Sequence, residues 1–193
     1  KTVIEIFEEQ VKKTPDNVAL VFEEKELTYK ELNEKANVLA KYLKDEKINN
    51  RIVGIREYKS IENVICILAL MKNKCTFVPI DSNLPEQRRE SIIEQLELQV
   101  IISYENEKCC IEKTRYYDDF KFIKYQELYV IFTSGSTGIP KGVKISNKNI
   151  VNLLNGTKMI EFSNCKVLQF ATLNFDVSYQ EIFSSLCNGA TLC

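Results

Sequence analysis

Apolar, β-prone segments alternate with helix-like segments through the middle of this chain, and this alternation restricts the fold more than any other feature. An apolar strand is predicted at 51–55 and a helix at about 60–72, followed by a second strand at 75–80. Pro85 can occupy the first turn of another helix, which precedes a strand at 98–103. Strands that are apolar throughout and alternate with helices favour parallel pairing with both faces of the sheet covered. We therefore predict an α/β fold with a mostly parallel sheet covered by helices.

The N-terminal part of the chain carries helix-start and hairpin signals. Apolar residues fall on one helical face at 2–13, and β-prone residues at 18–22 are followed by a short hairpin partner at 26–28. Thr28 and Glu31 then form a T-x-x-E capping box, which predicts the start of a further helix.

Composition and charge argue against several classes of protein. Lys and Arg number 26 against 27 Asp and Glu, without a basic stripe, so the sequence gives little support for a nucleic-acid partner. The longest apolar run, Val64 to Met71, is far shorter than the roughly 20 residues of a membrane-spanning helix, and we expect no membrane partner. The seven cysteines are odd in number and lack C-x-x-C spacing, which favours reduced thiols in a cytoplasmic protein over disulfides or a zinc site. With no histidine, the usual general base and the Ser-His-Asp arrangement are absent.

The most informative segment is a loop that directly follows an apolar strand beginning at Tyr129. Three of the six glycines lie between positions 135 and 142, and glycines leave backbone N–H groups free to face an anion. Neighbouring hydroxyls add donors and one lysine supplies a positive charge, whereas the spacing matches neither a Walker A loop nor G-x-G-x-x-G. The alternative is a plain surface turn rich in Ser, Thr and Gly. We predict a phosphate-binding loop made by Thr133, Ser134, Gly135, Ser136, Thr137, Gly138 and Lys141.

The ten residues from Thr133 to Gly142, TSGSTGIPKG, resemble the T-S-G-[ST]-T-G-x-P-K-G signature of the adenylate-forming superfamily. That superfamily includes acyl-CoA ligases, luciferase-like enzymes and the adenylation domains of nonribosomal peptide synthetases. Residues 27–33 (LTYKELN) and 77–81 (FVPID) are similar to two structural elements of the peptide-synthetase branch. Two departures stand out: residues 72–76 lack the glycine usual before the second element, and Asn147 replaces a frequent histidine.

An acidic residue in an apolar stretch is the second candidate for function. Only Asp176 and Glu181 are charged between positions 167 and 193, and burying an unpaired carboxylate costs several kcal/mol. Asp176 could simply cap a helix, but Ser178 and Glu181 already form an S-x-x-E capping box for a helix at 179–187. We therefore expect Asp176 to meet a cation from a ligand.

The segment from Phe175 to Ser178, FDVS, resembles the F-D-x-S element of the amino-acid-activating members. The resemblance implies that Asp176 pairs with the α-amino group of an amino-acid substrate. It also implies that Val177 and Gln180, beside Phe175, line the side-chain pocket, and the combination is similar to proline-selecting domains.

The family resemblance implies the reaction of an amino acid with ATP and Mg²⁺ to give aminoacyl-AMP and pyrophosphate. The aminoacyl group would then pass to the phosphopantetheine thiol of a peptidyl carrier protein domain, next to a condensation domain in the same synthetase. The chain would be an incomplete N-terminal part of the large N-terminal domain of this fold. Residues 1–127 would form a first αβ subdomain, whose last part, from Glu105, loses periodicity and should hold surface loops and a short strand at best. Residues 128–193 would hold the phosphate loop and the start of the substrate pocket.

The resemblance places the family's catalytic lysine and its Y-G-P-T-E element outside these 193 residues. We therefore expect no catalytic residue in this chain and no activity from the chain alone. Two alternatives remain open: a D-alanine carrier-protein ligase, which shares both motifs, and a non-catalytic nucleotide-binding remnant.

Overall fold

Strands and helices alternate along the computed structural model, which describes residues 1–57, 60–117, 127–133, 139–157, 162 and 165–193. The described helices are α1 (Val3–Lys13), α2 (Tyr29–Asp45), α3 (Ile61–Lys72), α4 (Glu86–Leu96), α5 (Asn147–Thr157) and α6 (Asp176–Leu186). The described strands are β1 (Val18–Phe22), β2 (Lys25–Thr28), β3 (Ile52–Glu57), β4 (Thr76–Asp81), β5 (Val100–Glu105), β6 (Lys108–Lys113), β7 (Glu127–Thr133), β8 (Lys141–Ser146), β9 (Lys166–Val167) and β10 (Thr191–Leu192).

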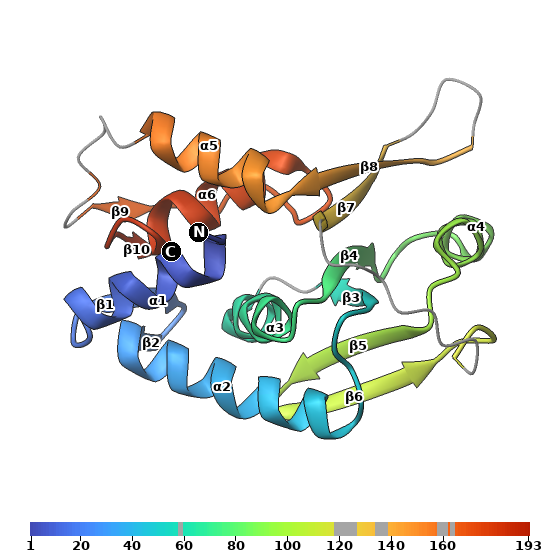
Figure 1. Cartoon of the computed structure of the whole chain (residues 1–193), viewed down its shortest axis with the longest axis horizontal. Coiled ribbons are helices and arrows are strands. Elements are labelled where there is room, and N and C mark those ends of the chain that lie inside the picture. The colour runs from blue at the N-terminus through green and yellow to red at the C-terminus, as the bar shows by residue number, and fades with distance from the viewer. Residues whose placement is uncertain (58–59, 118–126, 134–138, 158–161, 163–164) are drawn as a thin grey trace.

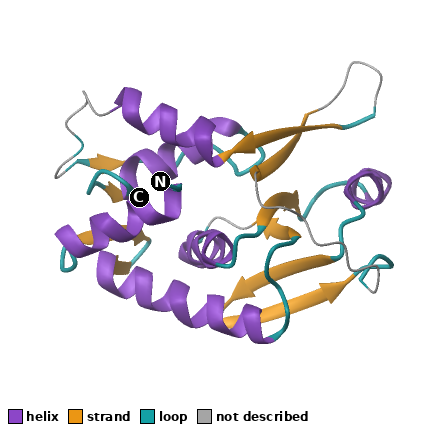
Figure 2. Cartoon of the chain, in the orientation of Figure 1, coloured by secondary structure: helices purple, strands orange, loops and turns teal. Residues whose placement is uncertain are grey.

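The larger sheet has the order β6-β5-β3-β4-β7-β8 among the described residues (Figure 1). Its four central strands run parallel, with β3 between β4 and β5 and with β7 beside β4. The two edge strands, β6 and β8, are antiparallel to their neighbours. The predicted α/β fold with a mostly parallel sheet is therefore confirmed (Figure 2).

Helices cover both faces of this sheet, as the uniformly apolar strands indicated. Helix α3 is apolar on all sides and contacts α2, β4 and β5, which explains why nearly all of its residues are buried. Along β4, Phe77 belongs to the core on the side of α3, while Val78 and Ile80 pack with residues of α4 on the other face. The alternation follows from the two-residue period of a strand.

The smaller sheet joins the two ends of the chain in the order β2-β1-β10-β9. Strand β1 pairs with β10 in parallel, with Leu20 opposite Leu192. The phenol of Tyr29, at the start of α2, donates to the carbonyl of Ala190 at 2.7 Å. Both sheets thus contain strands from either side of position 127, where the sequence suggested a subdomain boundary.

The predicted starts of the first two helices agree closely with the structure. Thr2 and Glu5 form a capping box at α1, and the predicted box of Thr28 and Glu31 opens α2. Strand β8 was not predicted, because its alternating residues directly follow the glycine-rich loop. Within the described residues no helix is long and apolar enough to cross a membrane.

Candidate functional site

The predicted phosphate loop begins at the end of strand β7, which runs from the core to the surface. Its residues from Leu128 to Ile131 are buried, and it ends at the exposed Thr133. The antiparallel strand β8 returns the chain, so that Lys141 lies opposite Thr133 in the ladder. Lys141 is exposed and starts a strand, whereas the sequence pattern predicted it in the loop. The predicted ligands Ser134, Gly135, Ser136, Thr137 and Gly138 lie outside the described residues.

Helix α4 holds the residue that directly precedes β8. The side-chain amide of Gln95 donates to the carbonyl of Pro140 at 3.0 Å. At Gly142, a Cβ atom would lie only 3.1 Å from the ring of Phe132 and 3.2 Å from Val130. A side chain here would therefore crowd the strand beneath it. No local pattern in the sequence indicates Gln95, whose partner is 45 residues away along the chain.

A cavity of about 490 Å³ lies where the ends of β4 and β7 meet α4 and the segment before α6. It brings together three predicted site residues, Thr133, Phe175 and Asp176. Val177 and Gln180 do not line it; Val177 is 51% exposed and Gln180 is exposed on the next turn of α6. The structure thus joins the start of the phosphate loop to the predicted ammonium-binding aspartate.

Asp176 is the first residue of α6 and is exposed, so the expectation that it is buried was wrong. The predicted capping box was also wrong: Ser178 donates to the carbonyl of Phe175 at 2.7 Å, and the carboxylate of Glu181 accepts from the N–H of Ala171. A carboxylate in the first turn is favoured by the helix dipole. Among the described residues, Asp176 has no hydrogen bond or ion pair, which leaves its carboxylate available to a cation.

An aromatic cluster joins β4, β7 and α6 in the core. The rings of Tyr129 and Tyr179 stack with centroids 4.0 Å apart, and Phe77 packs 5.6 Å from each. Burial is the main cause that raises the pKa of Tyr129, and the nearby Asp176 carboxylate raises it further. Burial, together with Tyr129 and Glu57, raises the pKa of Tyr179. Both phenols therefore stay neutral at physiological pH and can act as O–H donors.

The described residues offer donors suited to a phosphate group rather than ligands for a protein-bound metal. Thr133 and Arg88 both line the cavity, and Lys141 lies opposite Thr133 in the ladder. Within the described part of the chain, no group of three or more Cys, Asp or Glu residues could hold a metal ion.

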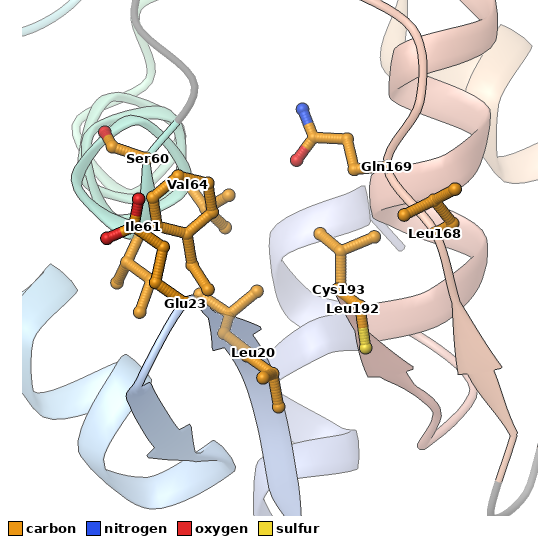
Figure 3. A pocket seen from close by; sticks show the side chains of 11 residues that line it. Leu20, Glu23, Ser60, Ile61, Val64, Leu168, Gln169, Leu192 and Cys193 are labelled. Carbon is orange, nitrogen blue, oxygen red and sulfur yellow. The ribbon is translucent and has the colours of Figure 1, made fainter.

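A second cavity, of about 380 Å³, lies between β1, the start of α3 and the end of β10 (Figure 3). Its wall is mostly apolar, with Leu20, Val64 and Leu192 among the lining residues. None of the predicted site residues that the structure describes lines it. Among its described lining residues Glu23 is the one with a charged side chain, so we assign the candidate site to the larger cavity.

Asn147, which stands where a histidine is frequent in the resembling family, makes a structural contact. It begins α5, and its side-chain oxygen accepts from the backbone N–H of Val3 at 3.1 Å. This bond ties α5 to the first turn of α1, and Asn147 is not among the residues that line the cavity.

The sequence profile of the AMP-binding enzyme family matches residues 7–127 and 124–193. Among curated proteins, gramicidin S synthase 2 of Brevibacillus brevis is 39% identical over 209 residues, which cover 100% of this chain and 5% of that protein. Tyrocidine synthase 1 of Brevibacillus parabrevis is 34% identical over 215 residues, covering 100% of this chain and 20% of that protein. The chain therefore spans a small fraction of the length of these relatives.

Solved structures give the same picture. The N-terminal subdomain of Klebsiella oxytoca NpsA, in complex with 3-hydroxyanthranilyl-AMSN, superposes with a TM-score of 0.83 at 31% identity, covering 100% of this chain and 52% of that chain. An artificially fused adenylation and carrier-protein di-domain, NpsA-ThdA, superposes with a TM-score of 0.81 at 30% identity, covering 100% of this chain and 42% of that chain. Both are similar over the whole of this chain and extend well beyond it.

Proposed function

Because this chain belongs to the AMP-binding enzyme family, whose members here include peptide-synthetase adenylation domains, we propose that it forms part of an enzyme that activates an amino acid. The reaction joins the amino acid to ATP, giving aminoacyl-AMP and pyrophosphate. The aminoacyl group then passes to the phosphopantetheine thiol of a carrier protein. The observation that carries this proposal is the single cavity that contains both Thr133 and Asp176.

The residues of the cavity suit the two ends of such a reaction. Thr133, with Lys141 beside it, donates to the phosphates of ATP and stabilises the departing pyrophosphate. Asp176 binds the α-ammonium group and thereby orients the substrate carboxylate toward the α-phosphate. A substrate oxygen bonds to the α-phosphorus as the bond to the bridging β-phosphate oxygen breaks. Positioning and charge neutralisation do most of this work, which suits a chain without histidine.

The carboxylic acid that is activated could be an amino acid or an aryl acid. The NpsA structures carry 3-hydroxyanthranilyl and 3-hydroxybenzoyl ligands, so an aryl acid is the competing substrate class. Asp176 favours an amino acid because its carboxylate lines the cavity, where an α-ammonium group supplies the opposite charge. Phe175 lines the cavity and would contact the substrate side chain. Val177 and Gln180 do not line the cavity, and we propose that they contact the same side chain from the exposed side of α6. Proline is our specific expectation.

The remaining expectations follow from the relatives. Gramicidin S synthase 2 and the NpsA-ThdA fusion favour a carrier-protein partner, with a condensation domain in the same cytoplasmic synthetase. A D-alanine carrier-protein ligase is the alternative enzyme, and a non-catalytic remnant is the alternative without activity. We propose that residues 128–193 form the part that binds ATP and the substrate.

The test is amino-acid-dependent ATP–pyrophosphate exchange by the complete adenylation domain that contains this chain, with panels of amino acids and aryl acids. We expect exchange with an amino acid, and Asp176→Asn should raise the KM for it about 100-fold because the ammonium loses its counter-charge. The KM for ATP should stay within about twofold of the wild type. Asp45→Asn, at an exposed position on α2, is the matched control. Exchange with aryl acids alone would refute the proposal.

A further inference from the structure

Glu57 lies at the same edge of the sheet as the candidate site but was not among the predicted residues. It is the last residue of β3 and is half-buried, opposite Asp81 in the parallel ladder with β4. Asp81 lines the larger cavity. The carboxyl ends of parallel strands are where ligand sites form in sheets of this kind.

The carboxylate of Glu57 holds the segment that leads into α6. Its Oε1 accepts from the backbone N–H of Leu173 at 2.5 Å, and its Oε2 accepts from the side-chain amide of Asn174 at 2.5 Å. These partners are 116 and 117 residues away along the chain. Hydrogen bonds to a charged acceptor are about twice as strong as neutral ones, so this contact ties α6 to β3 firmly.

Leu173 is also held from the opposite side. Its carbonyl accepts from the phenol of Tyr179 at 2.7 Å, and its side chain is buried. A turn then brings the N–H of Phe175 to the carbonyl of Thr172 at 3.0 Å. Because Thr172, Asn174, Phe175 and Asp176 all line the cavity, fixing Leu173 and Asn174 also fixes this wall.

We propose that Glu57 is a positioning residue, which anchors residues 173–174 to the end of β3 and so sets where Phe175 and Asp176 meet the substrate. The inference rests on the proposed function, in which this wall contacts the acid to be activated. Glu57 itself need not touch substrate. This role requires a carboxylate at position 57. Its two oxygens accept from the Leu173 N–H and from the Asn174 side chain, whereas an amide in its place has one accepting oxygen for these two donors.

A reciprocal exchange tests the proposal in the complete adenylation domain. Glu57→Gln and Asn174→Asp each break one bond of the pair, and each should raise the KM for the activated acid about tenfold, with the KM for ATP within about twofold of the wild type. In the double variant E57Q/N174D the new amide at 57 donates to the new carboxylate at 174 and still accepts from Leu173. The KM should then return to within about threefold of the wild type. Glu34→Gln, at an exposed position on α2, is the matched control.

Hydrogen exchange of the peptide covering 172–176 gives a readout that needs no substrate. Protection should fall in each single variant and recover in the double variant. An unchanged KM in both single variants, a parallel rise in the KM for ATP, or a double variant that recovers neither readout would overturn the role of Glu57. If the domain activates an acid without an ammonium group, the proposed function fails, while the KM for that acid in the same variants still decides the role of Glu57.

Discussion

Lys74 occupies a backbone conformation that glycine usually takes. Its φ of 55° lies in the left-handed region, just after the end of α3. The N–H of Lys74 bonds to the carbonyl of Met71 at 3.1 Å, and the N–H of Cys75 bonds to that of Leu70 at 2.9 Å. This is a Schellman helix end with a lysine at its left-handed position. The turn at 72–76, which lacks the glycine usual in the peptide-synthetase branch, thus keeps the conformation that a glycine would favour.

Replacing Lys74 by glycine should stabilise the chain. A side chain in the left-handed region costs about 1 kcal/mol relative to glycine, and Lys74 is exposed, so Lys74→Gly should raise the free energy of unfolding by that amount. Urea denaturation of the 193-residue chain measures this change through the midpoint at constant slope. Lys41→Gly, at an exposed position inside α2, should instead lower the free energy by about 1 kcal/mol. A lower midpoint for Lys74→Gly would contradict the assigned conformation.

The residues of the site were only partly predictable from the sequence. Asp176 was identified because it is a charged residue in an apolar stretch of the sequence. The argument assumed that its carboxylate is buried, whereas the structure shows it exposed. The S-x-x-E pattern wrongly predicted a capping box, because local spacing does not show that the Glu181 carboxylate accepts a hydrogen bond from the N–H of Ala171. Glu57 gave no signal, since a charged residue at a strand end is ordinary and its partners are more than 100 residues away.

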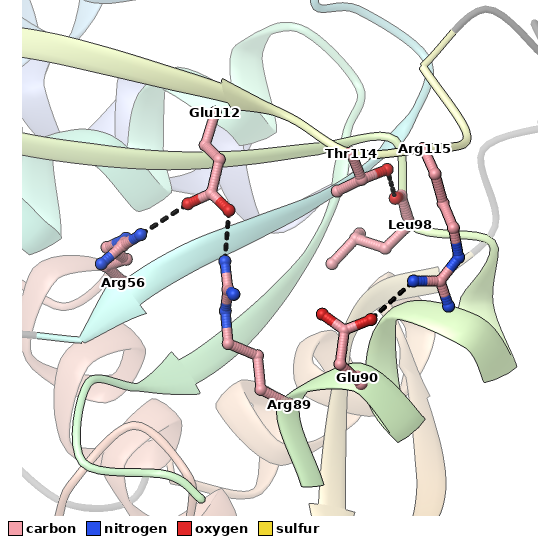
Figure 4. Close-up of polar contacts among 7 residues, drawn as sticks. All are labelled: Arg56, Arg89, Glu90, Leu98, Glu112, Thr114 and Arg115. Atoms are coloured by element: carbon pink, nitrogen blue, oxygen red, sulfur yellow. Dashed lines mark hydrogen bonds and ion pairs between the residues drawn. The ribbon is translucent and has the colours of Figure 1, made fainter. Parts of the chain in front are cut away.

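At the scale of elements, Glu112 links three of them. From β6 it accepts hydrogen bonds from Arg56 on β3, at 2.5 Å, and from Arg89 on α4 (Figure 4). Burial acts to raise the pKa of Glu112, but the hydrogen bonds from the two arginines outweigh it and hold the pKa below its ordinary value of 4.5. The negative charge therefore stabilises the edge of the larger sheet.

The low pKa of Glu112 predicts a contribution to stability that depends on pH. Because the folded pKa lies below the unfolded value, the contribution is complete above about pH 4.5 and is lost as the pH falls through the folded pKa. At pH 7, Glu112→Gln should lower the free energy of unfolding by roughly 1 kcal/mol, since these side chains are partly exposed. Urea midpoints measured between pH 7 and pH 3 should converge for the two proteins. A constant difference across that range would show that the ion pairs are not responsible.

Local signals predicted most elements but not how distant ones pair. Capping boxes and periodicity located α1, α2 and the central strands, because those signals lie within a few residues of each element. The parallel pairing of Leu20 with Leu192 has no such local signal. Strand β8 was missed because its glycine and lysine resembled a continuation of the loop, and only its ladder with β7 reveals a strand.

At the scale of the whole molecule, four large apolar side chains are exposed around the approach to α6. Leu168 is 66% exposed, Phe170 77%, Phe175 64% and Val177 51%. Two of them flank Asp176 directly. The chain spans about half of the NpsA subdomain structures that it matches, and those structures hold their ligands within a longer polypeptide. Under the proposed function, the longer polypeptide of a complete domain would cover these side chains and exclude water from the carboxylate.

This exposure predicts that the 193-residue chain alone catalyses no amino-acid-dependent ATP–pyrophosphate exchange. An ion pair between a substrate ammonium and Asp176 in open water contributes only about 1 kcal/mol, which is too little to hold an amino acid in place. The complete domain should show exchange, because the same pair is stronger once water is excluded. Both proteins should be assayed at equal concentration, with circular dichroism confirming that the shorter one is folded. Exchange by the folded 193-residue chain would mean that these residues already form a closed site, and that the exposed wall at Phe175 and Val177 needs no further cover.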